Sequence, residues 1–186
     1  MTTQLILVSH GITQWNEEGR IQGHTDVPLN QCGKTMAQCL AKRLSSKNIH
    51  AIYTSDLKRA YQTGMPTAEN KNFKIIQDIR LREGRCINQE RSHTYPTLPF
   101  SKEVETEADL FLRMEAVLSE IAHSHDNQTV LVVSHGGALD VFIKKILENT
   151  NHKFLKYHGI RMALNQINYD DGLWYCVNLN ENEFLT

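Results

Sequence analysis

The stretch Leu5-Ile6-Leu7-Val8-Ser9-His10-Gly11 is a short apolar run that ends in serine, histidine and glycine. Four branched apolar residues in a row are typical of a strand buried on both faces, as in parallel sheets. Residues 129–133 form a second such run, and Ser134-His135-Gly136 follows it. Ligands of open α/β sheets bind outside the carboxyl ends of the strands. Both histidines are therefore expected at the edge of the sheet where a site would form.

Further strands and helices alternate along the rest of the chain. An amphipathic pattern predicts helices over about 33–47, 57–69, 106–125 and 138–148, with strands over 51–53 and 73–77 and a terminal hairpin over 166–169 and 174–179. Residues 14–31 are expected to be a loop with one helical turn, and residues 81–104 to be irregular. This order predicts an α/β fold, a three-layer α/β/α sandwich around a mostly parallel central sheet.

The helix expected from residue 57 has capping residues before it and helix-breaking residues within it. Thr54-Ser55-Asp56 offers capping side chains just before the helix that is expected from residue 57. Gly64 and Pro66 lie within this helix and are expected to weaken or kink it.

Length and composition bound the kind of protein. A chain of 186 residues predicts a single domain over 1–186. Its composition, 40% hydrophobic and 22% charged, is that of an ordinary globular protein, and its formal charge of -1 predicts neither nucleic-acid nor membrane binding. The four cysteines show no metal-binding spacing and there is no secretory signal, so we expect reduced thiols and a cytoplasmic protein. The oligomeric state stays open.

The residues themselves suggest roles for the paired histidines. A single histidine at a strand end is more often structural, but two of them, each followed by glycine, favour a joint site. Imidazole can act as a nucleophile or carry protons near neutral pH. Glycine lets a ligand approach the backbone, whose N–H groups can bind an anion.

Two further side chains are candidates on weaker grounds. Arg59 lies one turn into a predicted helix that follows a strand, so its guanidinium either binds a phosphate at the same edge or is an ordinary solvated charge. Glu83 lies in a predicted loop, where a raised pKa would make it a general acid.

Six segments together resemble the histidine phosphatase superfamily, the phosphoglycerate-mutase-like proteins. The resemblance covers essentially the whole chain, and its motifs follow the family's order. The segments are 7–16 (LVSHGITQWN), 21–30 (IQGHTDVPLN), 53–63 (YTSDLKRAYQT), 81–83 (LRE), 105–113 (ETEADLFLR) and 130–137 (VLVVSHGG).

This resemblance implies a mechanism. His10 would attack phosphorus and become transiently phosphorylated, Arg59 and His135 would hold the phosphoryl oxygens, and Glu83 would protonate the leaving alcohol. Transfer of this kind depends mostly on positioning and charge stabilisation, so the resemblance implies neither a metal nor another cofactor. The other positions expected to bind phosphate or substrate are Ser9, Gly11, Asn16, Gln22, Gly23, Glu90 and Gly136.

The chain departs from the family pattern at two places. Ser9 stands where the family has an arginine that grips the phosphate; Arg20, Arg82 and Arg161 are candidate substitutes, and the sequence does not select among them. After Glu83, Ile87 replaces one family glycine, and in the triplet 89–91 only the central glutamate, Glu90, matches.

The chain is short for the mutase branch, which favours hydrolysis of a small phosphorylated metabolite. Two alternatives remain. One is a catalytically impaired phosphate-binding or regulatory domain, suggested by Ser9 and the altered segment after Glu83. The other is phosphoglycerate mutase activity. Substrate choice is expected to depend on residues 84–104.

Overall fold

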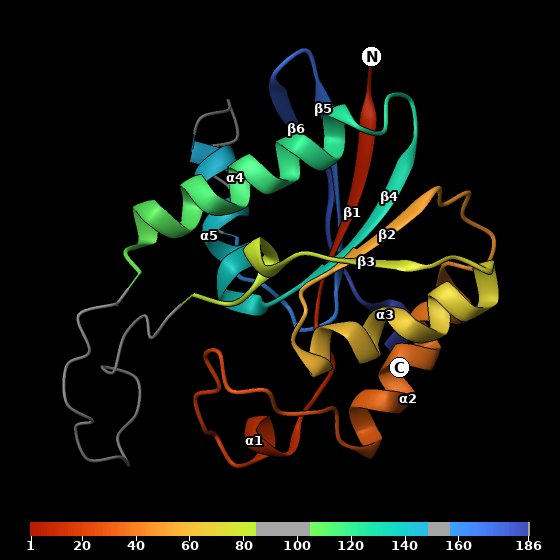
Figure 1. Cartoon of the computed structure of the whole chain (residues 1–186), viewed down its shortest axis with the longest axis vertical. Coiled ribbons are helices and arrows are strands. Elements are labelled where there is room, and N and C mark those ends of the chain that lie inside the picture. Colours follow the sequence, from red (N-terminus) through yellow and green to blue (C-terminus); the bar gives the residue numbers. More distant parts are fainter. Residues whose placement is uncertain (85–104, 149–156, 186) are drawn as a thin grey trace.

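The computed structural model describes residues 1–84, 105–148 and 157–185. Its sheet has the strand order β3-β2-β4-β1-β5-β6 (Figure 1). The four strands β1 to β4 are parallel, whereas β5 pairs antiparallel with β1 and with β6. The strands are β1 (Thr3–Ser9), β2 (Ala51–Thr54), β3 (Ile75–Gln77), β4 (Thr129–Ser134), β5 (Leu164–Asp170) and β6 (Leu173–Glu181). The predicted mostly parallel sheet and the terminal hairpin are confirmed.

Helices cover both faces of this sheet, as predicted. Helices α2 and α3 lie on one face, and α4 and α5 lie on the other (Figure 1). The helices are α1 (Gln14–Glu17), α2 (Gln31–Arg43), α3 (Lys58–Lys71), α4 (Glu107–His123) and α5 (Gly136–Glu148), with 3-10 turns η1 (Ile79–Leu81) and η3 (Glu183–Leu185). No helix within the described ranges is long and apolar enough to cross a membrane.

Strand β1 is buried on both of its faces. Leu5 and Leu7 pack in the core under α4 and α5, whereas Ile6 and Val8 pack in the core under α2 and α3. Successive side chains of a strand point to opposite faces, so an uninterrupted apolar run is what a central strand between two helical layers requires.

Helix α3 corrects two expectations. It continues through Gly64 and Pro66 as far as Lys71, because its face against the sheet is buried along its whole length. A Cβ at Gly64 would lie 3.0 Å from a methyl group of Thr54, so glycine here allows close packing on β2. The capping prediction was wrong, since the N-cap residue is Leu57, and the N–H of Lys58 donates instead to Oδ1 of Asp26 over 2.7 Å.

Two other boundaries near the sheet edge also differ from the prediction. Helix α5 begins at Gly136, two residues earlier than expected, so that it starts directly after His135. Leu81 ends a 3-10 turn instead of opening an irregular segment, and its side chain is buried. The loop that carries α1 lies beyond the carboxyl ends of the parallel strands (Figure 1). The start of α5, the 3-10 turn η1 and the loop that carries α1 therefore meet at this edge of the sheet.

Candidate active site

The two Ser-His-Gly segments meet at the carboxyl edge of the sheet. Strands β1 and β4 are neighbours, and their register pairs Ser9 with Ser134. The backbone N–H of His10 donates to the Ser134 carbonyl over 3.0 Å. The imidazole centroids of His10 and His135 lie 5.2 Å apart, with the rings inclined by 63°. The predicted joint placement of the histidines is therefore confirmed by the pairing of the strands.

His10 is held as a neutral imidazole with one tautomer. Its Nδ1 lies 2.7 Å from the Gly11 carbonyl oxygen, which can only accept a hydrogen bond. Nδ1 therefore carries the proton and Nε2 has the free lone pair. Loss of water on burial, followed by the charge of Arg59, lowers the pKa of His10 to about 3, although the Gly11 carbonyl acts in the opposite direction.

His135 is buried beside His10 but has different hydrogen bonding. Among the described residues, neither of its ring nitrogens has a hydrogen-bond partner. Burial, then the neighbouring His10 and Arg59, lower the pKa of His135 well below its usual range. An imidazole with two unpaired nitrogens is costly inside a protein unless something else binds it.

Arg59 is a fully buried side chain at the start of α3. Its exposed fraction is 0%, which rules out the solvated helix charge that the sequence left open. Nη1 donates to the Thr25 carbonyl over 2.8 Å and Nη2 donates to the Gly23 carbonyl over 2.7 Å, while Nε has no partner among the described residues. Burial lowers the pKa of Arg59 to about 10, against the attraction of Glu83 and Asp26, so the group stays charged at neutral pH.

The Glu83 carboxyl lies against the first turn of α5. Oε1 accepts from the N–H groups of Gly84 over 3.0 Å and Ala138 over 2.8 Å, and Oε2 accepts from Gly137 over 3.1 Å. A Cβ on Gly137 would come within 2.8 Å of Oε1, so only glycine allows this approach. Burial raises the pKa of Glu83, and the three N–H groups and Arg59 oppose that rise.

The loop between β1 and α2 brings three predicted residues to the same place. Thr13 caps α1, and its hydroxyl lies 3.1 Å from Oδ1 of Asn16 and 3.0 Å from Oε1 of Gln22. Both amide oxygens thus face Thr13, which leaves the NH2 groups as the ends that can donate to an anion. Gly23 has a φ of +47°, a conformation suited to glycine, and its carbonyl holds Arg59 as described above.

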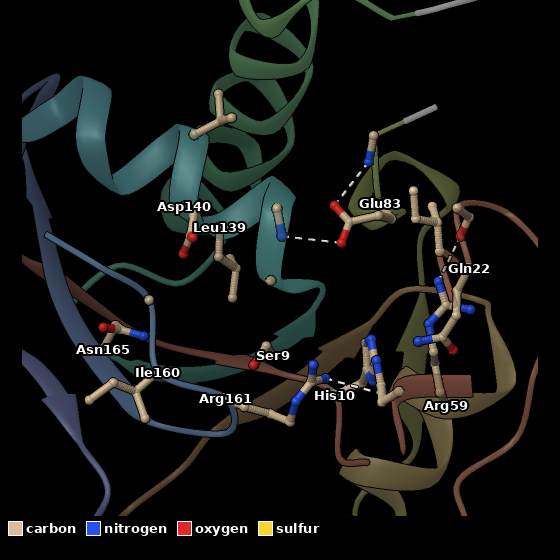
Figure 2. Close-up of a pocket in the computed structure, with 18 of the residues that line it drawn as sticks. Ser9, His10, Gln22, Arg59, Glu83, Leu139, Asp140, Ile160, Arg161 and Asn165 are labelled. Atoms are coloured by element: carbon tan, nitrogen blue, oxygen red, sulfur yellow. Dashed lines mark hydrogen bonds between the residues drawn. The ribbon is translucent and has the colours of Figure 1, made fainter. Parts of the chain in front are cut away.

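Several of these groups line a cavity of about 560 Å³. Figure 2 shows His10, Arg59 and Gln22 at one end of it, with Asp140, Ile160 and Asn165 at the other. The predicted residues that line it are Ser9, His10, Asn16, Gln22, Gly23, Arg59, Glu83 and Gly136. The lining residues that were not predicted as site residues are Ile21, Gly84, Gly137, Leu139, Asp140, Val141, Lys144, Tyr157, Gly159, Ile160 and Asn165.

Three arginines are candidates to replace the phosphate-binding arginine that the family has at position 9. Of these, Arg161 has the position that fits this role best. It lines the cavity, and Figure 2 shows it between Ser9 and His10. Arg20 also lines the cavity, but its guanidinium stacks 3.7 Å above the ring of Trp15. Arg82 forms a bidentate ion pair with Asp56 instead, and it is not among the residues that line the cavity.

Gly11 lies between two closely packed backbones. The N–H of Gly11 donates to the Thr63 hydroxyl over 3.0 Å, and a Cβ at Gly11 would lie 2.9 Å from the Gly33 carbonyl oxygen. Gly11 thus allows two backbones to pack closely, and its N–H is already engaged, so the phosphate contact of Gly11 stays a prediction. Glu90 and Ile87 lie outside the described residues.

Within residues 1–84, 105–148 and 157–185, no group of three or more His, Cys, Asp or Glu side chains is arranged to hold a metal ion.

The fold and the histidine pair define an α/β protein with a buried polar site at the carboxyl edge of its sheet. The family model of the histidine phosphatase superfamily (branch 1) matches residues 5–182. The chain belongs to this superfamily, and its class of activity is that of a phosphatase, a phosphoric ester hydrolase.

Individual relatives resemble the chain over most of its length. Phosphoserine phosphatase 1 of Hydrogenobacter thermophilus is 36% identical over 149 residues, which cover 71% of this chain and 70% of the relative. Phosphoglycerate mutase-like protein 4 of Arabidopsis thaliana is 35% identical over 191 aligned residues, covering 87% and 83%. The solved structure of Bacillus stearothermophilus YhfR superposes with a TM-score of 0.85 at 27% identity, covering 99% of this chain and 100% of that one.

Proposed function

We propose that this chain hydrolyses small phosphate monoesters through a phosphohistidine on His10, without a metal ion. The observation that carries this proposal is the buried pair of neutral imidazoles: one has a free Nε2 lone pair, and the other has unpaired ring nitrogens. A phosphate monoester would accept hydrogen bonds from His135 and from Nε of Arg59. Its negative charge would also raise the lowered pKa values of both histidines.

The first step transfers the phosphoryl group to the protein. The Nε2 lone pair of His10 attacks phosphorus while the bond between phosphorus and the leaving oxygen breaks. Protonated Glu83 gives its proton to that oxygen. The imidazole ring becomes positive as the N–P bond forms, and the hydrogen bond from Nδ1 to the Gly11 carbonyl stabilises this charge.

The second step returns the protein to its starting state. Water attacks the phosphorus of phosphohistidine and gives a proton to the Glu83 carboxylate. The N–P bond breaks, inorganic phosphate leaves, and His10 is again neutral. Burial raises the pKa of Glu83 whereas three backbone N–H groups lower it, and these opposed effects suit a group that must both release and take up a proton.

The far end of the cavity supports a polar leaving group. Asp140 and Lys144 lie one turn apart on α5 and bring opposite charges to the wall, and burial raises the pKa of Asp140. An amino acid phosphate, with an ammonium and a carboxylate beside its phosphate, would match these charges. The phosphoserine phosphatase relative makes phosphoserine the first substrate to assay.

The test is hydrolysis of an aryl phosphate and of phosphoserine near pH 6 with a chelator present. We compare the wild-type protein with His10→Ala and with His123→Ala, whose histidine lies at the exposed end of α4 outside the cavity. Turnover that survives chelation in wild type and His123→Ala, and is lost in His10→Ala, is the expected result. Rapid acid-free quenching with labelled substrate should then trap an alkali-stable phosphoprotein in the first two proteins alone.

Other outcomes favour the alternatives. If the wild-type protein binds phosphate but does not turn over, the phosphate-binding domain is the better description. If phosphoprotein forms but its phosphoryl group moves to a second hydroxyl of phosphoglycerate instead of to water, the protein is a mutase, as the name of the Arabidopsis relative indicates for that protein.

A further inference from the structure

The described cationic groups around His10 differ in how many of their N–H groups are free to bind a phosphate. A phosphate dianion beside His10 needs charged hydrogen-bond donors on several sides. Each terminal nitrogen of Arg59 already donates one N–H to a backbone carbonyl, which leaves the Nε–H and one N–H on each terminal nitrogen. His10 and His135 are neutral before a phosphate binds, because burial lowers both pKa values. Arg59 is thus the single cation among these three side chains, and part of its guanidinium is already engaged by the backbone.

Arg161 has both the position and the free donors that this site lacks. Its one hydrogen bond to a described group runs from Nη1 to Oδ1 of Asn16 and is long, at 3.3 Å. The charge of Arg161 reaches His10, whose pKa it helps to lower, and Glu83 attracts it. Figure 2 shows its side chain extended along the floor of the cavity beside His10. A guanidinium held by one long bond can turn two N–H groups toward a phosphate.

The position of Arg161 depends on a hydrogen bond that Ser9 makes with the next residue, Met162. The Ser9 hydroxyl accepts the backbone N–H of Met162 over 2.9 Å. Met162 is fully buried and has a φ of +60°, a conformation that costs energy for a residue with a side chain. The hydrogen bond to Ser9 is one contact that holds this turn, and Arg161 is the residue immediately before it. The hydroxyl of Ser9 therefore has a structural role in holding the turn that contains Arg161.

We propose that Arg161 is the phosphate-binding cation of this site, and that Ser9 is the positioning residue that holds the Arg161 turn against β1. The inference rests on the proposed function, since it assigns Arg161 to the phosphate that His10 attacks. It explains how a chain with serine before the nucleophile keeps a second arginine in the site. The positive charge is supplied by a side chain of the turn before β5 instead of by one at the end of β1.

The first test measures binding of inorganic phosphate by titration calorimetry near neutral pH, together with kcat/KM for the aryl phosphate. Arg161→Gln removes the charge, Arg161→Lys keeps it without the forked donors, and Arg43→Gln removes one positive charge outside the cavity, where Arg43 pairs with Glu181. We expect Arg161→Gln to weaken phosphate binding about 10-fold or more, Arg161→Lys to weaken it less, and Arg43→Gln to leave it unchanged.

The second test separates position from charge. Ser9→Ala loses the acceptor for Met162 and should weaken phosphate binding severalfold, whereas Ser9→Thr keeps the hydroxyl and should restore it. Ser9→Arg alone should bring little gain because a cation is already present. In the Arg161→Gln protein, Ser9→Arg should recover much of the lost phosphate affinity. Melting temperatures of all variants show whether a loss of binding is merely a loss of folded protein.

Failure of this inference and failure of the proposed function look different. If turnover depends on His10 but Arg161→Gln binds phosphate as tightly as Arg43→Gln does, the Arg161 inference is wrong and the function stands. If Arg161→Gln loses phosphate binding in a protein with no turnover that depends on His10, the inference stands and the function is wrong. A wild-type protein that binds no phosphate at millimolar concentration overturns both.

Discussion

The two Ser-His-Gly segments are identical in sequence and lie in register on neighbouring strands, but their side chains differ in hydrogen bonding. In the first segment, His10 donates to the Gly11 carbonyl and keeps a free Nε2, whereas in the second, both nitrogens of His135 lack a partner among the described residues. The Ser9 hydroxyl accepts the N–H of Met162, and the Ser134 hydroxyl donates to the Leu81 carbonyl over 2.7 Å. One tripeptide thus serves two different tasks.

The two serines hold different segments of the chain against the sheet. Ser134 holds the chain two residues before Glu83, and Ser9 holds the chain next to Arg161. Each serine therefore connects a strand of the sheet to a separate segment that carries a functional side chain. In the proposed mechanism, the first segment places the nucleophile and a cation, and the second places a hydrogen-bond donor to the phosphate and the acid. The predictions below test this division of roles.

Replacing the two histidines one at a time should give the largest difference. His10→Ala removes the nucleophile, and we expect it to lower kcat by about 10³-fold or more and to abolish phosphoprotein formation. His135→Ala removes a donor to the phosphoryl group, and we expect a loss of roughly 10²- to 10³-fold with phosphoprotein still detectable. Rapid-quench kinetics with labelled substrate measure both. Equal phosphoprotein levels in the two variants would contradict the assignment of the nucleophile.

The acid should show itself in the pH profile. His10 has a pKa of about 3, so its lone pair stays free down to pH 5 and kcat/KM should not fall between pH 7 and pH 5. Glu83 acts while protonated, and its pKa is raised, so the rate should fall as pH increases through that pKa. Glu83→Gln cannot transfer a proton and should lose about 10²- to 10⁴-fold in kcat on an alkyl phosphate, and less on an aryl phosphate, whose oxygen leaves unaided. A Glu83→Gln protein that keeps the wild-type pH dependence would rule out this role.

The two glycines should differ in their effect on folding. A Cβ at Gly11 meets the Gly33 carbonyl oxygen at 2.9 Å, whereas a Cβ at Gly136 meets nothing within 4 Å. We expect Gly11→Ala to reduce the free energy of unfolding by about 1–3 kcal/mol through overpacking, and Gly136→Ala to leave it nearly unchanged. Urea denaturation followed by fluorescence compares them. A stable Gly11→Ala protein would mean that the two backbones separate at little cost.

The smallest effect is expected from Ser134→Ala. This change leaves the Leu81 carbonyl without its hydrogen bond, which is worth about 1 kcal/mol, so kcat should fall by no more than about 10-fold as Glu83 loses its support. Phosphate affinity should stay as in wild type, in contrast to Ser9→Ala. If Ser134→Ala weakened phosphate binding as much as Ser9→Ala does, the two serines would not have the separate roles described above.

The sheet and the histidine pair were predictable because they depend on local patterns. Two buried runs such as Leu5–Val8 can be recognised without any partner, and parallel strands bring their carboxyl ends to one edge. The start of the helix near Leu57 was predicted, but its capping was not predictable in the same way. The capping side chains at residues 54–56 are present, but Asp56 pairs with Arg82, a residue distant in sequence, and is therefore not used as a cap.

The sequence by itself determined the α/β fold, the family, and the identity of His10, Arg59, Glu83 and His135 as candidate residues, because each lies in a motif of adjacent residues. Only the tertiary structure decided which nitrogen of His10 is free, that Arg59 is buried, and that Arg20 stacks on Trp15 and Arg82 pairs with Asp56 whereas Arg161 lies in the cavity. These depend on contacts between segments far apart in the chain, such as the hydrogen bond between Ser9 and Met162. Hydrogen bonding and burial are properties of neighbours in space, and those neighbours exist only once the sheet has formed.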